Sequence, residues 1–175
     1  MLEARAFLAS LDEMKEILNK QNAVYKGEYQ IHDIIYSPKD KNKTLTDEFL
    51  RLRVISKNIW DEKDVIVAVK NTELKEKGKN SIVPLKKQFD TKEDAQSYIN
   101  ENILDKFEHL YEFDRTGWQY DLGDDQVDME DIEGHFSIEV KSATEEGLQK
   151  LIKLFGLENI LKGPSVVEIK ELLKR

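Results

Sequence analysis

The chain has no cysteine among its 175 residues. Disulfide bonds, thiolate metal sites and a cysteine nucleophile are therefore excluded. No stretch approaches the roughly 18 consecutive apolar residues that a membrane-spanning helix needs. The first ten residues lack the long apolar run of a secretory signal, and an acidic residue, Glu3, stands third. We therefore expect a cytoplasmic protein with no membrane partner.

An excess of positive charge is also missing, since the formal net charge is -8 at pH 7. Proteins that bind nucleic acid non-specifically usually present a net basic surface, so nucleic acid is not an expected partner. The chain also lacks a glycine-rich phosphate-binding loop and the dinucleotide-binding glycine motif. A small anion remains compatible, because a few converging basic side chains can bind phosphate inside an acidic molecule.

Alternation of apolar and polar residues predicts more strands than helices, and the strands come in consecutive runs. This pattern favours an α+β protein with an antiparallel sheet, and without linkers or repeats residues 1–175 form a single domain. Ser10 with Glu13, and Thr91 after Asp90, have the spacing or position of helix starts. A turn is predicted at 75–80, and Pro84 indicates a sheet edge or a bulge. The expected strands are 2–9, 25–36, 49–55, 63–70, 81–89, 107–122, 126–130 and 135–141, and the expected helices are 11–21, 91–104, 144–157 and 164–175.

Charged side chains occupy the second face of several of these strands. Arg51 and Arg53 alternate with leucines and lie about 7 Å apart along one strand face, as the strand rise requires. Glu3 and Arg5 share a face of the first strand, and Lys141 shares a face of the last one with a glutamate. Arginine suits phosphate because its planar fork binds two oxygens at once. Two interpretations are open: a cage around a bound phosphate, or a solvated outer surface with cross-strand ion pairs.

At this point the ordered segments resemble the CYTH superfamily of triphosphate tunnel enzymes, over nearly the whole chain. The first residues, Met1 to Arg5, are similar to the Glu-x-Glu-x-Lys motif of that family, with the first Glu lost and Lys exchanged for Arg. GEYQIHDIIYSP is similar to the Gln-x-Asp-x-Tyr-Phe segment, with Asp33 at the Asp. LRLRV is similar to the Arg-x-Arg strand and VAVK to the Leu-Thr-x-Lys strand, which ends here at Lys70.

The later part of the chain carries the best-spaced match. An Asp followed by Gly six and Phe eight residues later is typical of the family, and Asp128, Gly134 and Phe136 satisfy this spacing. Ser137 stands where the family has a first Glu, and Glu139 where it has a second.

The resemblance implies an antiparallel eight-stranded β-barrel or tunnel with flanking helices, which binds a triphosphate with Mg²⁺ or Mn²⁺. By this analogy Glu3, Asp128 and Glu139 are the metal ligands. Arg5, Lys70 and Arg115 are the predicted catalytic residues. The predicted phosphate ligands are Arg5, Arg51, Arg53, Lys70, Lys86 and Arg115.

The implied function is that of a class IV adenylyl cyclase-like enzyme, which converts ATP to cyclic AMP and pyrophosphate as a monomer or homodimer. Two alternatives stay open. One is a triphosphatase for inorganic tripolyphosphate or thiamine triphosphate, and the other is a module that binds nucleotides or polyphosphate without turnover. Met1 and Ser137, at positions of expected carboxylates, put a second metal and an activated water in doubt. The acidic run Glu130, Asp131 and Glu133 is interpreted as a solvated turn rather than a metal site.

Overall fold

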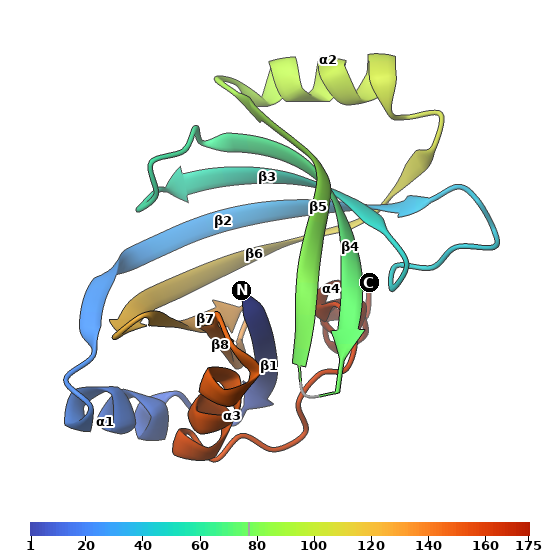
Figure 1. The fold of residues 1–175 in the computed structure, drawn as a ribbon. Helices are drawn as coiled ribbons and strands as arrows, with labels where there is room; N and C mark the ends of the chain where they lie inside the picture. The colour runs from blue at the N-terminus through green and yellow to red at the C-terminus, as the bar shows by residue number, and fades with distance from the viewer. Residues whose placement is uncertain (77) are drawn as a thin grey trace.

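A computed structural model describes residues 1–76 and 78–175. Within them, eight antiparallel strands form one sheet that closes on itself as a ring, in the order β1-β5-β4-β3-β2-β6-β7-β8, and four helices accompany it. Figure 1 shows that the long curved strands β2 and β6 run side by side. The strands are β1 (Leu2–Leu8), β2 (Val24–Pro38), β3 (Phe49–Lys57), β4 (Val65–Lys75), β5 (Gly78–Phe89), β6 (Phe107–Leu122), β7 (Asp125–Ile132) and β8 (His135–Ser142). The helices are α1 (Asp12–Lys20), α2 (Lys92–Asn102), α3 (Glu145–Leu154) and α4 (Ser165–Leu173).

The predicted antiparallel α+β class is confirmed, and each predicted strand and helix is present; β6 has the predicted ends, and the other elements have shifted ends. β4 and β5 reach further into the predicted turn at 75–80 than alternation indicated, and residue 77 of that turn lies outside the described residues. Thr91 caps α2 as predicted, since its hydroxyl accepts the N–H of Asp94 at 3.1 Å. The prediction that Ser10 caps α1 is wrong. Leu11 is the N-cap and lacks a side-chain cap bond, while the Ser10 hydroxyl accepts the N–H of Asp12 at 3.2 Å.

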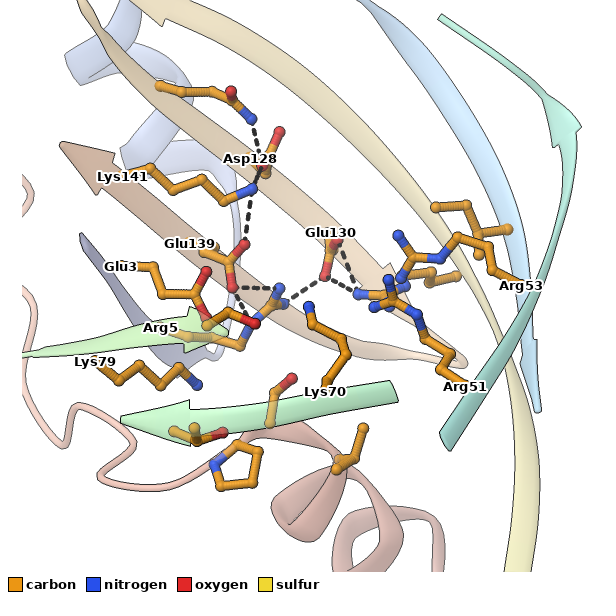
Figure 2. Close-up of a pocket in the computed structure, with 18 of the residues that line it drawn as sticks. Glu3, Arg5, Arg51, Arg53, Lys70, Lys79, Asp128, Glu130, Glu139 and Lys141 are labelled. Carbon is orange, nitrogen blue, oxygen red and sulfur yellow. Dashed lines mark hydrogen bonds and ion pairs between the residues drawn. The ribbon is translucent and has the colours of Figure 1, made fainter. Parts of the chain in front are cut away.

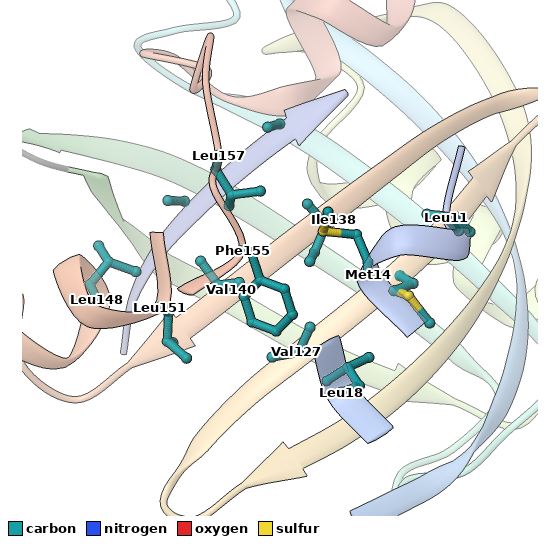
Figure 3. Close-up of a cluster of buried hydrophobic side chains, with 13 residues drawn as sticks. Leu11, Met14, Leu18, Val127, Ile138, Val140, Leu148, Leu151, Phe155 and Leu157 are labelled. Carbon is teal, nitrogen blue, oxygen red and sulfur yellow. The ribbon is translucent and has the colours of Figure 1, made fainter. Parts of the chain in front are cut away.

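The two faces of the sheet have different environments. On the outer face, α1 and α3 pack over β1, β7 and β8, and Figure 3 shows Val127, Ile138 and Val140 beneath the apolar side chains of these helices. On another part of the outer face, α2 covers the apolar residues of β2, β3 and β4. The alternate residues of the strands face inward, so the outer apolar layers determine which side chains enter the ring.

One end of the ring interior is filled by α4. Val166 and Ile169 of this helix pack against inward-facing aromatic residues, among them Phe49 and Phe113. The hydroxyl of Tyr111 donates a hydrogen bond to the carbonyl of Val166. The helix therefore closes one side of the space that remains within the ring. Among the described residues, none of the helices is long and apolar enough to cross a membrane.

Candidate functional site: a charged cavity inside the ring

A cavity of about 330 Å³ lies inside the ring (Figure 2). Its floor includes Pro164, Ser165 and Val166 at the start of α4. Four acidic side chains from β1, β7 and β8 line it among the described residues, namely Glu3, Asp128, Glu130 and Glu139. The basic side chains in the same lining outnumber them and are Arg5, Arg51, Arg53, Lys70, Lys79, Arg115 and Lys141.

Strand alternation explains why so many charges enter one space. In β1, Ala4 and Ala6 are fully buried in the outer apolar layer, so Glu3 and Arg5 face inward. In β8, Ile138 is fully buried in the same outer apolar layer, so the adjacent Glu139 faces inward. The interpretation of these faces as a solvated outer surface is therefore wrong for the residues that line the cavity.

A bulge lies beside Lys70. Val69 pairs with Leu85 and the next pair joins Asn71 to Ile82, so Val83 and Pro84 together oppose Lys70 alone. Pro84 was predicted to mark a sheet edge or a bulge, and this irregularity confirms the bulge. Bulges often redirect a side chain next to a functional site. This bulge adjoins Lys70, the only basic residue that β4 contributes to the described lining of the cavity.

Arg5 is held by acidic partners on β7 and β8. Its Nε and Nη2 donate to Oε2 of Glu139 at 3.1 and 2.9 Å, and its Nη1 donates to Ser137 Oγ at 2.8 Å and to Glu130. Burial alone would lower the pKa of Arg5, but Glu130 and Glu139 outweigh that effect and raise the pKa well above its usual range. Arg5 is thus a fixed cation whose hydrogen bonds are directed at the protein.

A second group of ion pairs surrounds Asp33, whose carboxylate is fully buried. Arg53 donates to both of its oxygens at 2.8 Å, and Arg115 Nη2 donates to Oδ2. Burial would raise the pKa of Asp33, but Arg53 and Arg115 hold it well below the usual value of 3.8. Arg115 also donates to both oxygens of Glu130 at 3.2 Å, which links the two groups.

Lys141 joins two of the predicted metal ligands. Its Nζ lies 2.8 Å from Asp128 Oδ2 and 3.0 Å from Glu139 Oε1. Burial would lower the pKa of Lys141, but Glu139 and Asp128 outweigh it and raise the pKa, so the ammonium is charged. Figure 2 shows Lys141 in line between the two carboxylates.

Arg51 and Lys70 differ from the other basic residues of the lining, because neither donates a hydrogen bond to a described residue. Arg51 Nε is buried without a hydrogen-bond partner in the part of the chain that the structure describes, and it lies 4.0 Å from Asp33, whose oxygens accept hydrogen bonds from Arg53 and Arg115. Burial, and then repulsion by Arg53, lowers the pKa of Arg51 to about 9. Burial, and then repulsion by Arg51, lowers the pKa of Lys70 to about 7. Both side chains point into the cavity in Figure 2.

Most of the predicted site residues come together. Glu3, Asp128 and Glu139, the predicted metal ligands, line the cavity, and so do five of the six predicted phosphate ligands. The exception is Lys86, which shares the inner face with Ala68 but lies outside the cavity, with its side chain 45% exposed and paired to Glu62. Lys79 of the same strand lines the cavity instead, and its Nζ donates to the carbonyl of Gly163 at 2.8 Å.

Sequence reasoning missed two acidic partners of this site. Glu130 is not in a solvated turn, as predicted, but is 3% exposed between Arg5 and Arg115. The signal was present, since Glu130 is two residues from Asp128 and therefore on the same strand face. Arginine attraction outweighs the burial of Glu130 and lowers its pKa to about 2. Asp33 was noted in a motif, but its pairing with two arginines was not predicted.

The three predicted metal ligands do not form a ready metal site. No group of three metal-ligating side chains is found in the part of the chain that the structure describes. Asp128 accepts hydrogen bonds from Gln119 and Gln126 at 3.0 Å and a further one from Lys141. Glu139 accepts hydrogen bonds from Arg5 and forms an ion pair with Lys141. Glu3 accepts no hydrogen bond from a described residue, and burial, followed by repulsion from Glu139, raises its pKa. A divalent ion held by all three carboxylates does not fit this arrangement.

One wall of the cavity is apolar and aromatic. Tyr29, Ile31 and Trp60 contribute to it, with the Tyr29 and Trp60 rings 4.8 Å apart. Trp118 and Tyr120, which are typical of either a core or a base-stacking surface, belong to the outer face, where they pack against the cluster beneath α1 and α3. Trp60 therefore contributes to the cavity wall, whereas Trp118 does not.

Comparisons with known proteins give structural matches alone. No protein-family model and no curated protein sequence matches this chain. A solved protein of Pyrococcus horikoshii is 18% identical, with 99% of each chain covered and a TM-score of 0.71. A candidate adenylate cyclase of Vibrio parahaemolyticus is 16% identical, with 99% of this chain and 97% of that chain covered and a TM-score of 0.66. A candidate adenylyl cyclase of Hippeastrum with a dominant triphosphatase activity is 13% identical, with 93% and 90% covered and a TM-score of 0.65. At these identities the similarity shows that the fold is shared.

Proposed function

We propose that the cavity binds the triphosphate group of a small molecule. The observation that carries this proposal is the pair Arg51 and Lys70, two inward-facing basic side chains that donate no hydrogen bond to a described residue and whose pKa values are lowered by burial. A buried cation without compensation is costly to the folded state, and such unpaired charges commonly mark a ligand site. A phosphate chain supplies the missing negative charge and several acceptor oxygens at once.

The size and charge of the cavity fit this ligand class. Basic side chains outnumber acidic ones in its described lining, although the whole chain is acidic. Its volume of about 330 Å³ lies at the small end of the range of about 300–1,000 Å³ for small-molecule sites. A compact, highly charged anion therefore suits the cavity better than a large apolar ligand.

We further propose that the bound triphosphate is processed. An adenylyl cyclase-like conversion of ATP is the first candidate, and hydrolysis of tripolyphosphate or thiamine triphosphate is the second. The dominant triphosphatase activity of the Hippeastrum neighbour supports considering the second. Phosphoryl transfer depends mainly on positioning and on stabilisation of charge, which an array of fixed basic residues can supply without a side-chain nucleophile.

The basic residues of the cavity would have two different roles in binding the triphosphate. Arg51 and Lys70 would bind phosphate oxygens directly, while Arg5 and Arg115, held by Glu130, would present a fixed positive wall. Mg²⁺ or Mn²⁺ is a proposed cofactor for turnover, and it would neutralise phosphate charge. Glu3 is the predicted ligand whose carboxylate is free to receive it, and Mg²⁺ is often held by one or two carboxylates together with substrate phosphates.

The experiment measures binding and products separately. Isothermal titration calorimetry with tripolyphosphate, ATP and thiamine triphosphate tests binding, and incubation with Mg²⁺ or Mn²⁺ tests turnover. Cyclic AMP would identify the cyclase, released phosphate the triphosphatase, and binding without product a binding module. Absence of binding to all three compounds would reject the proposal.

A variant pair links binding to the cavity. Arg51→Met should weaken tripolyphosphate binding by about tenfold or more, since it removes charge-assisted hydrogen bonds to the ligand. Lys57→Met changes an exposed lysine at the end of the same strand and serves as the matched control. Equal affinities of the two variants would contradict the placement of the phosphate beside Arg51.

A further inference from the structure

The ammonium of Lys141 lies where a metal shared by Asp128 and Glu139 would have to lie. Its Nζ is 2.8 Å from one carboxylate and 3.0 Å from the other. Both carboxylates are buried, so the ion pairs are shielded from water. A divalent ion cannot share this position, because it would be repelled by the ammonium and would need the same oxygen lone pairs.

Most of the other acceptor sites of the two carboxylates are also occupied. Gln119 donates to Asp128 Oδ1 and Gln126 to Oδ2, each at 3.0 Å. Arg5 donates twice to Glu139 Oε2. Metal coordination at this point would therefore break several hydrogen bonds in addition to displacing Lys141. The two carboxylates are therefore organised around an ammonium group rather than around a metal ion.

We infer that Lys141 is a built-in substitute for a divalent metal between Asp128 and Glu139, so that this cavity binds a triphosphate without metal. This inference rests on the proposed function. An ammonium has three N–H donors, and the two carboxylates use two of them. Because Lys141 lines the cavity, the third donor is available to a phosphate oxygen. The role assigned to Lys141 concerns binding of the anion, whereas Glu3 remains the proposed metal contact for turnover.

The first test needs no variant. Binding of tripolyphosphate to the purified chain is measured by calorimetry with excess EDTA and again with Mg²⁺. We expect affinities that agree within about threefold, since the basic residues alone supply the charge. Binding that appears only with Mg²⁺ would overturn the inference while leaving the proposed function intact. Absence of binding under both conditions would reject the proposed function and the inference together.

The second test asks whether the position accepts a metal once the lysine is gone. Lys141→Glu places a third carboxylate beside Asp128 and Glu139, and Lys141→Gln removes the charge alone. We expect the ligand-free wild-type chain to leave added Mn²⁺ free in electron paramagnetic resonance spectra, and Lys141→Glu to bind it. Lys141→Gln should weaken tripolyphosphate binding in EDTA by about tenfold, the scale of a charge-assisted hydrogen bond.

Lys150→Gln is the matched control, because its side chain on α3 is 74% exposed and pairs with Glu146. It should bind tripolyphosphate like the wild type. Wild-type binding of Mn²⁺ at Asp128, shown by its loss in Asp128→Asn, would overturn the inference even if the Lys141 variants failed to fold.

Discussion

Glu130 receives Nη1 of Arg115 at 3.2 Å on both of its carboxylate oxygens, with both side chains buried inside the ring. The same carboxylate also receives Arg5, so that one acidic residue of β7 holds two arginines from β1 and β6. Glu130 therefore fixes both arginines in the ligand-free cavity. Rigid cations of this kind lose little freedom when an anion arrives.

Removal of this charge should destabilise the fold. In Glu130→Gln, Arg5 and Arg115 lose a shared counter-charge in a buried site, and the free energy of unfolding should fall by about 3 kcal/mol. Chemical denaturation followed by circular dichroism measures the change. Glu108→Gln, at an exposed position of β6, is the control and should stay within about 0.5 kcal/mol of the wild type. A fall no larger than that of the control would show that the arginines do not depend on Glu130.

Binding of the triphosphate should depend on pH through Lys70. With a pKa of about 7, this lysine is partly neutral in the free protein. Burial is the largest cause of this lowered pKa; Arg51 and Arg53 lower it further, and Glu3 and Glu139 raise it. A bound polyanion favours the charged form, so binding near pH 7 should take up about half a proton per molecule, and the affinity should fall as the pH rises above 7.

Calorimetry in buffers of different ionisation enthalpy measures this proton uptake. Lys70→Met is the comparison, because titration of the ligand itself affects both proteins equally. The wild type should take up more protons than the variant at pH 7 to 8. Identical proton uptake by the two proteins would be inconsistent with Lys70 at the phosphate.

Acid should unfold the protein through Asp33. The pKa of this carboxylate is well below 3.8 in the folded protein, because Arg53 and Arg115 outweigh its burial. Its contribution to stability is therefore complete above the unfolded value near pH 4 and is lost as the pH falls toward the folded pKa. Asp33→Asn should be less stable at pH 7 and should lose less stability below pH 4 than the wild type.

Thermal unfolding at a series of pH values checks this prediction. Asp105→Asn, at an exposed position, is the control and should follow the wild-type curve. Parallel curves for Asp33→Asn and the wild type would mean that Asp33 does not carry the acid sensitivity.

Two lysines of β5 should differ in their effect on binding. Lys79 lines the cavity, whereas Lys86 is exposed and pairs with Glu62. Lys79→Met should weaken tripolyphosphate binding by about tenfold, and Lys86→Met by less than about threefold. Calorimetry on both variants, with melting temperatures to verify folding, makes the comparison. The reverse order would favour the prediction from sequence that Lys86 contacts phosphate.

Strand positions and shared faces could be predicted because alternation is a local property of the chain. Arg51 and Arg53 were placed together on this basis, and so were Glu3 and Arg5. Alternation does not say whether a face looks into a ring or out to water, since that depends on which strands pair. The outer helices settle it here by covering the apolar residues between the charged ones.

Partners far apart in the sequence could not be predicted in this way. Arg115 and Asp33 are separated by 82 residues, and their contact depends on the register between β2 and β6. Lys79 was missed because KEKGKN has the composition of a turn, while β5 begins at Gly78. Motif similarity favours Lys86 as a phosphate ligand, but it does not reveal that Lys86 pairs with Glu62 outside the cavity.

Closure of the ring has a consequence for the order in which the molecule assembles. β1 pairs with β8 over residues more than 120 positions apart, and the floor of the cavity comes from α4, which follows β8. Contacts between such distant segments form slowly, because the loop between them must be closed first. During synthesis a nascent chain would therefore carry its arginines early but acquire a complete anion-binding cavity only after α4 has emerged.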